Sequence, residues 1–137
     1  MNGNKILLDS NIIVYLLAGD KTVADLLHEK TTYISFISEL ELLGYSDLTN
    51  QEYEEINRLL KQCFIVDVNP EIKSQSIAIR KKYKIKLPDS IVVATSLFLD
   101  IPIQTRGYQK SMASTSFCIN DPKLRLSLQY YETLAKR

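Results

Sequence analysis

The sequence predicts an α/β fold, a three-layer α/β/α sandwich around a mostly parallel central sheet. Short apolar segments with strand character alternate with segments of helical periodicity along the chain, and this alternation typically produces a parallel sheet with helices on both faces. Several of the helical segments also begin with a capping residue, Asp, Ser or Thr. At 137 residues the chain fits one domain, which we expect to span residues 1–137.

The first half of the chain contains three predicted strands, each followed by a helical pattern. Ser10 is the expected cap of a helix that stops before Gly19, and Asp20 is the expected cap of the next. Ser38 and Thr49 are each followed three residues later by Glu, which is the form of a capping box and predicts two further helix starts. The predicted strands cover residues 5–8, 32–36 and 63–68.

The second half repeats the alternation. Pro70 opens a helix that ends in a basic segment, and Pro88 opens one that runs to about Leu99 and is apolar nearly all round, as a buried helix is. Two short strands are predicted at residues 101–105 and 116–119, and a closing helix at about 122–136.

Composition excludes several classes of function. The net charge is +1, from 17 basic and 16 acidic residues, so any nucleic-acid binding must be local rather than spread over the surface. Cys63 and Cys118 have no neighbouring Cys or His at metal spacing, and we expect two reduced, buried thiols and no zinc. The single His28 is expected to be a helix residue without a catalytic role.

The chain begins without an apolar stretch of signal-peptide form, and no apolar run approaches the roughly 20 residues that span a bilayer. We therefore expect a soluble, cytoplasmic protein that does not associate with membranes.

Four polar residues follow predicted strands or open predicted helices, where α/β proteins bind ligands. They are Asp9, Asn11, Glu41 and Asp89. Two carboxylates about 4 Å apart repel by ~4 kcal/mol at an effective dielectric constant of 20, so a cluster of them calls for a neutralising cation or proton. Oxygen ligands favour Mg²⁺ or Mn²⁺.

Each of these residues also has a purely structural interpretation. Asn11 fits a solvent-facing helix position, and Glu41 fits the reciprocal arm of a capping box with Ser38. Asp9 and Asp89 border buried apolar segments, where a charge needs a reason. Glu39 and Glu41 project about 200° apart on a helix, so only one of them can face a site, and the spacing alone does not choose.

With these residues in place, the chain resembles the PIN-domain nucleases, and among them the VapC-like toxins of bacterial toxin–antitoxin pairs. Four short motifs carry the resemblance, in matching order over most of the chain. They are Leu7-Leu8-Asp9-Ser10-Asn11, Ser38-Glu39-Leu40-Glu41-Leu42-Leu43-Gly44-Tyr45, Leu87-Pro88-Asp89-Ser90 and Ile103-Gln104-Thr105-Arg106.

The resemblance implies specific roles. Asp9, Glu41 and Asp89 would be catalytic acids, with Asp9 and Asp89 as ligands of Mg²⁺ or Mn²⁺, and Asn11 and Thr105 would support them. The implied reaction is hydrolysis of RNA phosphodiesters by a metal-activated water. The implied partners are an RNA substrate, a neutralising antitoxin protein and a second copy of the chain in a homodimer.

One departure from the family pattern leaves an alternative open. After Thr105-Arg106 the family places further acids, whereas this chain has Gly107 and, nearby, Lys110. The alternative is therefore a degenerate PIN-like domain that binds RNA or a protein partner with weak or no catalysis. A third hypothesis, a phosphatase of the haloacid-dehalogenase type, requires a second Asp where this chain has Asn11.

Basic residues supply candidate RNA contacts. Arg106 and Lys110 lie beside the predicted site in sequence, and Arg80 and Lys82 belong to a cluster around Tyr83 that can pair with phosphates and stack on a base. Cations in the last turn of a helix are also favoured by the helix dipole, without any ligand.

Overall fold

The computed structural model describes residues 4–104, and four parallel strands form its sheet. The strand order is β3-β2-β1-β4, so β1 and β2 are central. Leu8 at the end of β1 is aligned with Ile34 of β2 and with Gln104 of β4. The strands are β1 (Lys5–Leu8), β2 (Thr31–Ser35), β3 (Phe64–Val66) and β4 (Ile103–Gln104). The predicted fold class, with a parallel sheet between helices, is confirmed.

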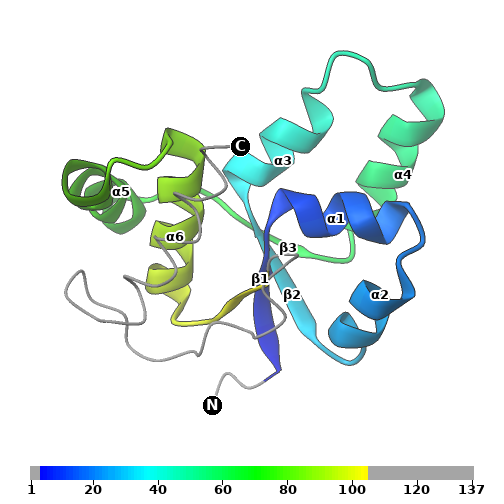
Figure 1. Ribbon diagram of the computed structural model, residues 1–137, viewed down its shortest axis with the longest axis horizontal. Coiled ribbons are helices and arrows are strands. Elements are labelled where there is room, and N and C mark those ends of the chain that lie inside the picture. The colour runs from blue at the N-terminus through cyan, green and yellow to red at the C-terminus, as the bar shows by residue number, and fades with distance from the viewer. Residues whose placement is uncertain (1–3, 105–137) are drawn as a thin grey trace.

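Six helices connect these strands in pairs and cover both faces of the sheet (Figure 1). They are α1 (Ser10–Leu17), α2 (Lys21–Leu27), α3 (Phe36–Leu43), α4 (Asn50–Leu60), α5 (Pro70–Tyr83) and α6 (Leu87–Leu99).

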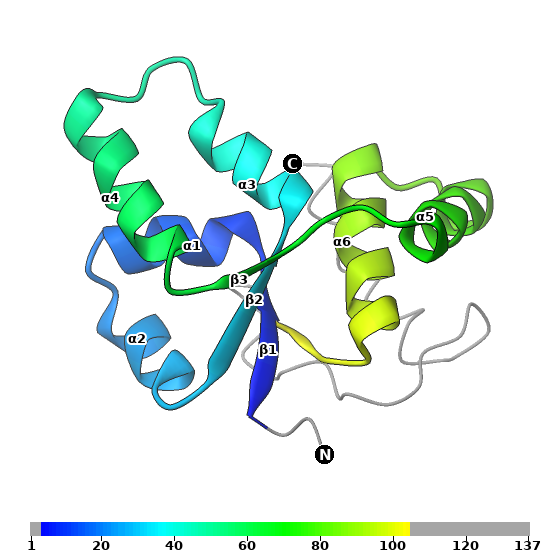
Figure 2. The ribbon, with the colours of Figure 1, turned by 180° about the vertical axis from the view of Figure 1, so that it is seen from behind.

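The chirality of the crossovers explains which helices lie on which face. The first two crossovers, β1 to β2 and β2 to β3, step in one direction across the sheet, and the third returns from β3 to β4 on the other side of β1. Parallel crossovers are right-handed almost without exception, so reversing the direction puts the connecting helices on the opposite face. Accordingly α1, α2 and α4 lie on one face, and α5 and α6 on the other (Figure 2).

Two hydrophobic clusters result, one on each face, and the alternation of side chains along β1 supplies both. Leu7 points into the cluster formed with α5 and α6, while Ile6 and Leu8 point into the cluster formed with α1 and α4. Helix α3 reaches both clusters, through Ile37 on one side and Leu42 on the other. This placement fixes α3 between the two helical layers.

Two predicted helix caps were wrong, and both corrections matter for the site. Asp9, not Ser10, is the N-cap of α1, and Ser10 is its first helical residue. Ser35, not Ser38, caps α3, because its hydroxyl accepts a hydrogen bond from the Ile37 N–H at 3.2 Å. Ser38 is fully buried inside α3, and its hydroxyl has no partner within residues 4–104. Glu41 is therefore not the arm of a capping box. The box predicted at Thr49 and Glu52 is confirmed.

Smaller differences concern strand length and the thiol. The edge strand β3 is three residues long rather than six, since only one side of it is paired. Cys63 is free but only half-buried, and its thiol accepts a hydrogen bond from the Thr32 hydroxyl. His28 is exposed at the end of α2, as expected.

Several predictions fall on residues 105–137, outside the described part. These are the strand at 116–119, the helix at about 122–136 and the surroundings of Cys118. The extent of one domain over residues 1–137 likewise stays a prediction. Within residues 4–104, every helix is too short or too polar to cross a membrane.

Candidate active site

The candidate site lies at the carboxyl edge of the sheet, at the end of β1. The chain leaves β1 toward β2 on one side, and β4 later joins on the other side. This is the point in a parallel sheet where the connections diverge and open a crevice for ligands. Asp9 is the first residue after β1 and therefore lies at this point.

The backbone holds Asp9 rigidly on both sides. Its own N–H donates to the Gln104 carbonyl at 3.2 Å, and its Oδ1 accepts a hydrogen bond from the Ser10 N–H at 2.8 Å. Only 7% of the residue is exposed. The pKa of the carboxyl is raised from 3.8 to about 6, mainly by burial and also by the charges of Asp89 and Glu41, against the lowering effect of the hydrogen bonds from Ser10.

Glu41 comes from the last turn of α3. Helix α3 ends at Gly44, where a side chain is excluded because a Cβ would lie 2.6 Å from the Leu40 carbonyl oxygen. Partial burial raises the pKa of the Glu41 carboxyl, and the neighbouring Asp89 charge adds to the increase. This influence of Asp89 identifies Glu41 as an acid that faces the site.

Asp89 comes from the first turn of α6, on the other helical layer. Lys86 is the N-cap residue of this helix, and Pro88 stands in its first turn. Burial raises the pKa of the Asp89 carboxyl, while the Lys86 ammonium works in the opposite direction. Lys86 is thus the nearest source of positive charge that the described part of the chain offers to this carboxylate.

The three acids predicted from sequence are therefore neighbours in space, although they come from β1, α3 and α6. They do not form a close cluster: within residues 4–104, no group of three acidic, His or Cys side chains lies close enough to hold a metal ion.

The donor set nevertheless suits a hard divalent cation. Every candidate ligand is a carboxylate oxygen, and burial raises the pKa values of all three carboxyls, so a bound cation would favour their charged forms. Asp9 and Asp89 are the residues that would hold Mg²⁺ or Mn²⁺, with Glu41 at the open side.

The free energy of unfolding should depend on pH through Asp9. Its pKa is about 6 in the folded chain and 3.8 when unperturbed, so the folded state binds this proton more tightly. The contribution of Asp9 to stability is therefore most favourable at low pH and is lost as the pH rises through 6. Relative to Asp9→Asn, the metal-free wild type should lose about 1 kcal/mol between pH 5 and pH 7 in urea unfolding. An equal pH dependence of the two proteins would show that Asp9 titrates normally.

The remaining predicted site residues have different positions. Asn11 is exposed in the first turn of α1. It is an amide and not the second acid that the phosphatase hypothesis needs. Arg80 and Lys82 are exposed in the last turn of α5, where Lys82 Nζ lies 5.6 Å from the centroid of the Tyr83 ring. Three further residues lie outside the described part: Thr105, Arg106 and Lys110.

Two contributors to the site were not singled out from the sequence. Gln104 is a buried polar residue in an apolar strand, and its carbonyl positions Asp9. Lys86 belongs to the basic segment that ends α5 and follows it, and it lies three residues before Asp89. The signal for Gln104 is a polar residue inside a short apolar strand. The signal for Lys86 is a Lys one turn before an acid at the start of a helix.

The parallel sheet with helices on both faces is the fold of a PIN domain. The PIN domain family model matches residues 6–109, and the chain belongs to this family of nucleases. No curated protein matches the chain.

Among solved structures, similar chains come from toxin–antitoxin complexes. One is a toxin–antitoxin complex from Klebsiella pneumoniae, with 26% sequence identity, a TM-score of 0.67, and coverage of 76% of this chain and 88% of that chain. Two others share the fold at lower identity. VapBC2 from Rickettsia felis, bound to a DNA fragment from its promoter, has 18% identity, a TM-score of 0.68 and coverage of 77% and 89%. VapBC-1 from nontypeable Haemophilus influenzae has 23% identity, a TM-score of 0.66 and coverage of 77% and 88%.

Proposed function

We propose that this protein is a metal-dependent endoribonuclease and the toxin component of a toxin–antitoxin pair. One observation carries the proposal: Asp9, Glu41 and Asp89, from three separate elements, lie near one another at the switch point of the sheet, and all three carboxyls have raised pKa values. Perturbed carboxyls that converge at the ligand-binding edge of a parallel sheet are typical of active sites.

Bound Mg²⁺ or Mn²⁺ would supply an activated water and neutralise charge on the scissile phosphate. In this account Asp9 and Asp89 bind the ion. Asp9 is well suited to this because the backbone on both sides of it is fixed by hydrogen bonds. Glu41, the more exposed acid, accepts a proton from the attacking water or orients it. Thr105, the next residue in the sequence after β4, would help to orient these ligands.

Positive charge near the acids gives RNA a path to the site. The basic end of α5, with Arg80 and Lys82, is joined to α6 by only residues 84–86, and Asp89 is in the first turn of α6. Phosphates bound along this short connection would lead to the carboxylates. Arg106 and Lys110 are further candidate contacts. We expect single-stranded or looped RNA, whose unstacked bases are accessible.

The partner and the assembly follow from the family. The similar solved structures are complexes of a toxin with its antitoxin, so we propose an antitoxin partner for this chain, a homodimer and a cytoplasmic location.

The alternative function is a degenerate PIN-like domain that binds RNA or a protein without cutting. The sequence observation behind it is Gly107 and Lys110 in place of the usual acids. Metal affinity separates the two functions, because only a working nuclease needs the ion.

The test of the nuclease function is cleavage of a mixed set of structured and single-stranded RNAs by the purified chain, freed of partner proteins. Cutting is expected in Mg²⁺ or Mn²⁺ and should stop in EDTA. RNA that stays intact at every metal concentration, with the protein folded, would contradict the nuclease function and favour the degenerate domain.

A matched pair of variants tests which glutamate of α3 acts. Glu41→Gln removes the charge that faces Asp89 and should lower the rate of cleavage by about 10²-fold or more, as loss of a group that assists proton transfer does. Glu39→Gln changes a half-buried neighbour on another side of the same helix and should leave the rate nearly unchanged. Equal effects of the two substitutions would mean that Glu41 acts only through the stability of α3.

A further inference from the structure

Tyr45 is the most exposed large hydrophobic side chain in residues 4–104, at 62%. It is the second residue after α3, and Gly44 between them donates its N–H to the Leu40 carbonyl at 2.8 Å. The Tyr45 carbonyl accepts a hydrogen bond from the Leu48 N–H at 3.4 Å. The end of the helix and the turn after it therefore hold the backbone of Tyr45, while its ring is open to solvent.

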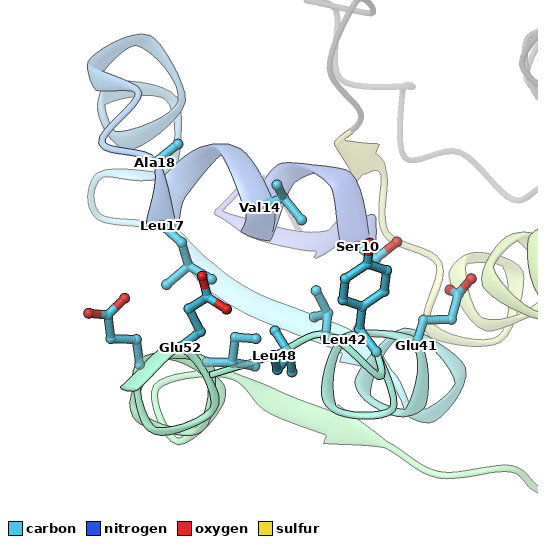
Figure 3. A pocket seen from close by; sticks show the side chains of 11 residues that line it. Ser10, Val14, Leu17, Ala18, Glu41, Leu42, Leu48 and Glu52 are labelled. Carbon is cyan, nitrogen blue, oxygen red and sulfur yellow. The ribbon is translucent and has the colours of Figure 1, made fainter. Parts of the chain in front are cut away.

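A single exposed hydrophobic side chain needs no explanation by itself, but the surroundings of Tyr45 connect it to the candidate acids. Tyr45 follows Glu41 by four residues, which puts the two side chains on the same side of α3 and about 6 Å apart along its axis. Both line one groove of about 540 Å³ between α1, α3 and α4, together with Ser10, the neighbour of Asp9. Ser10 and Glu41 lie at the same end of this groove (Figure 3).

The charge of the groove decides which part of an RNA strand can contact the ring. The described residues that line the groove include three acids, Glu41, Glu52 and Glu55, and no Lys or Arg. The rest of the lining is mostly apolar. Such a surface repels phosphates but not an uncharged base. A contact between RNA and this side of the site is therefore made by a base.

The positive charges lie on the other side of the acids. Arg80 and Lys82 are in the last turn of α5, and Lys86 is the N-cap residue of α6. Helices α5 and α6 cover one face of the sheet, whereas α1 and α4 cover the opposite face, with α3 between them (Figures 1 and 2). An RNA strand whose phosphates follow the basic connection to Asp89 would therefore present a base to Tyr45 across the site.

We propose that Tyr45 is a base-stacking residue, whose ring packs against the unpaired base of a nucleotide beside the scissile phosphate. The inference rests on the proposed function, in which RNA is the substrate, and adds a residue that selects it. Stacking on an aromatic ring raises the affinity by on the order of 10-fold per base and accepts every base, because each has a π face. Tyr45 thus selects unpaired RNA over a duplex, whose bases are already stacked on one another.

The first test is the fluorescence of single-stranded RNAs that carry 2-aminopurine at one position after another, mixed with the full chain in EDTA. Stacking on an aromatic ring quenches the fluorescence of this base, and EDTA removes the metal that cleavage requires. Wild type and Tyr45→Phe should quench the fluorescence at one or two adjacent positions. Tyr45→Leu keeps an apolar side chain without the ring and should not quench it.

Tyr53→Leu is the matched control. Tyr53 is also an exposed tyrosine, at 46%, but it lies on α4 and does not line the groove. This variant should quench like the wild type. Because Tyr45 and Tyr53 are both exposed, all of these variants should fold.

The second test is cleavage of single-stranded RNA in Mn²⁺. Tyr45→Leu should lower kcat/KM by about 10-fold, mainly through a higher KM, because the ring binds the substrate without taking part in the reaction. Tyr45→Phe and Tyr53→Leu should retain the wild-type value.

Three results would overturn the proposal: no quenching by the wild type at any position, quenching that survives in Tyr45→Leu, or an equal loss in Tyr45→Phe. If Tyr45→Leu changes neither RNA binding nor cleavage, the ring is left for contact with a protein partner, which also overturns it. Cleavage that Tyr45→Leu leaves unchanged contradicts only the stacking proposal. Quenching that depends on Tyr45, in a wild type that does not cleave RNA, contradicts only the nuclease function.

Discussion

Asp9→Asn should be more stable than the wild type in the absence of metal and should not cut RNA. The wild-type carboxylate is buried beside two other acids, and its pKa of about 6 reflects that cost. Asn keeps an oxygen that accepts the Ser10 N–H but carries no charge, so the free energy of unfolding at pH 7 should rise by about 3 kcal/mol. The rate of cleavage should fall by about 10²- to 10³-fold, as on loss of a charge-stabilising group in other enzymes.

Urea unfolding and RNA cleavage, measured on one preparation, check both parts of this expectation. Asp25→Asn, at an exposed position on α2, is the control and should change neither quantity. An Asp9→Asn protein that cuts RNA at the wild-type rate would remove Asp9 from the mechanism. One that unfolds more easily than the wild type would show that the carboxylate stabilises the fold.

Asp89→Asn should also lower the rate of cleavage strongly, with a smaller effect on stability. Asp89 is only half-buried, and the Lys86 ammonium offsets part of the cost of its charge. Its removal should leave the fold intact and lower the rate by about 10²- to 10³-fold. It should also lower the pKa of Glu41, because the Asp89 charge raises that pKa in the wild type.

Cleavage rates measured as a function of pH test both the lower rate and the lower pKa of Glu41, with Asp25→Asn again as the control. If Asp89→Asn retains the wild-type rate, the acids of α6 and β1 do not act in one site. If the variant fails to fold, Asp89 is required for the stability of α6, and a catalytic role is not supported.

The position of Asp9 was predictable because local and global signals agree there. Three apolar residues end at an acid, and the apolar run that follows contributes Ile12 and Ile13 to the same core cluster as Ile6 and Leu8. A charge between two buried segments of a parallel α/β protein lies at the carboxyl edge of the sheet almost by necessity. Asp89 was predictable for the same reason, since it opens a helix with six buried residues.

The role of Glu41 was harder to predict, because the residue at which α3 begins decides whether Glu41 belongs to a capping box. Both Ser35 and Ser38 satisfy the local rule for a helix cap, and tertiary packing decides between them by burying Ser38 inside the helix. A capping box at Ser38 would have given Glu41 a purely structural role. The spacing did not choose between Glu39 and Glu41, and the family resemblance favoured Glu41. In the structure, α6 brings the charge of Asp89 close to Glu41.

The groove could not be predicted from sequence. Val14 and Leu17 read as ordinary positions of an apolar helix, and nothing local distinguishes them from buried neighbours such as Ile13. In the structure they line the space between α1, α3 and α4 and stay partly exposed, whereas Ile13 is fully buried.

Calorimetric titration of the partner-free protein with Mn²⁺ at neutral pH tests the central claim most directly. The account predicts that the wild type binds Mn²⁺ and that Asp9→Asn and Asp89→Asn bind it at least about 10-fold more weakly, while Asp25→Asn binds it normally. Affinity should also fall below pH 6, where Asp9 takes up a proton. A folded wild-type protein that binds no Mn²⁺ would contradict the metal site and leave a PIN domain that binds without cutting.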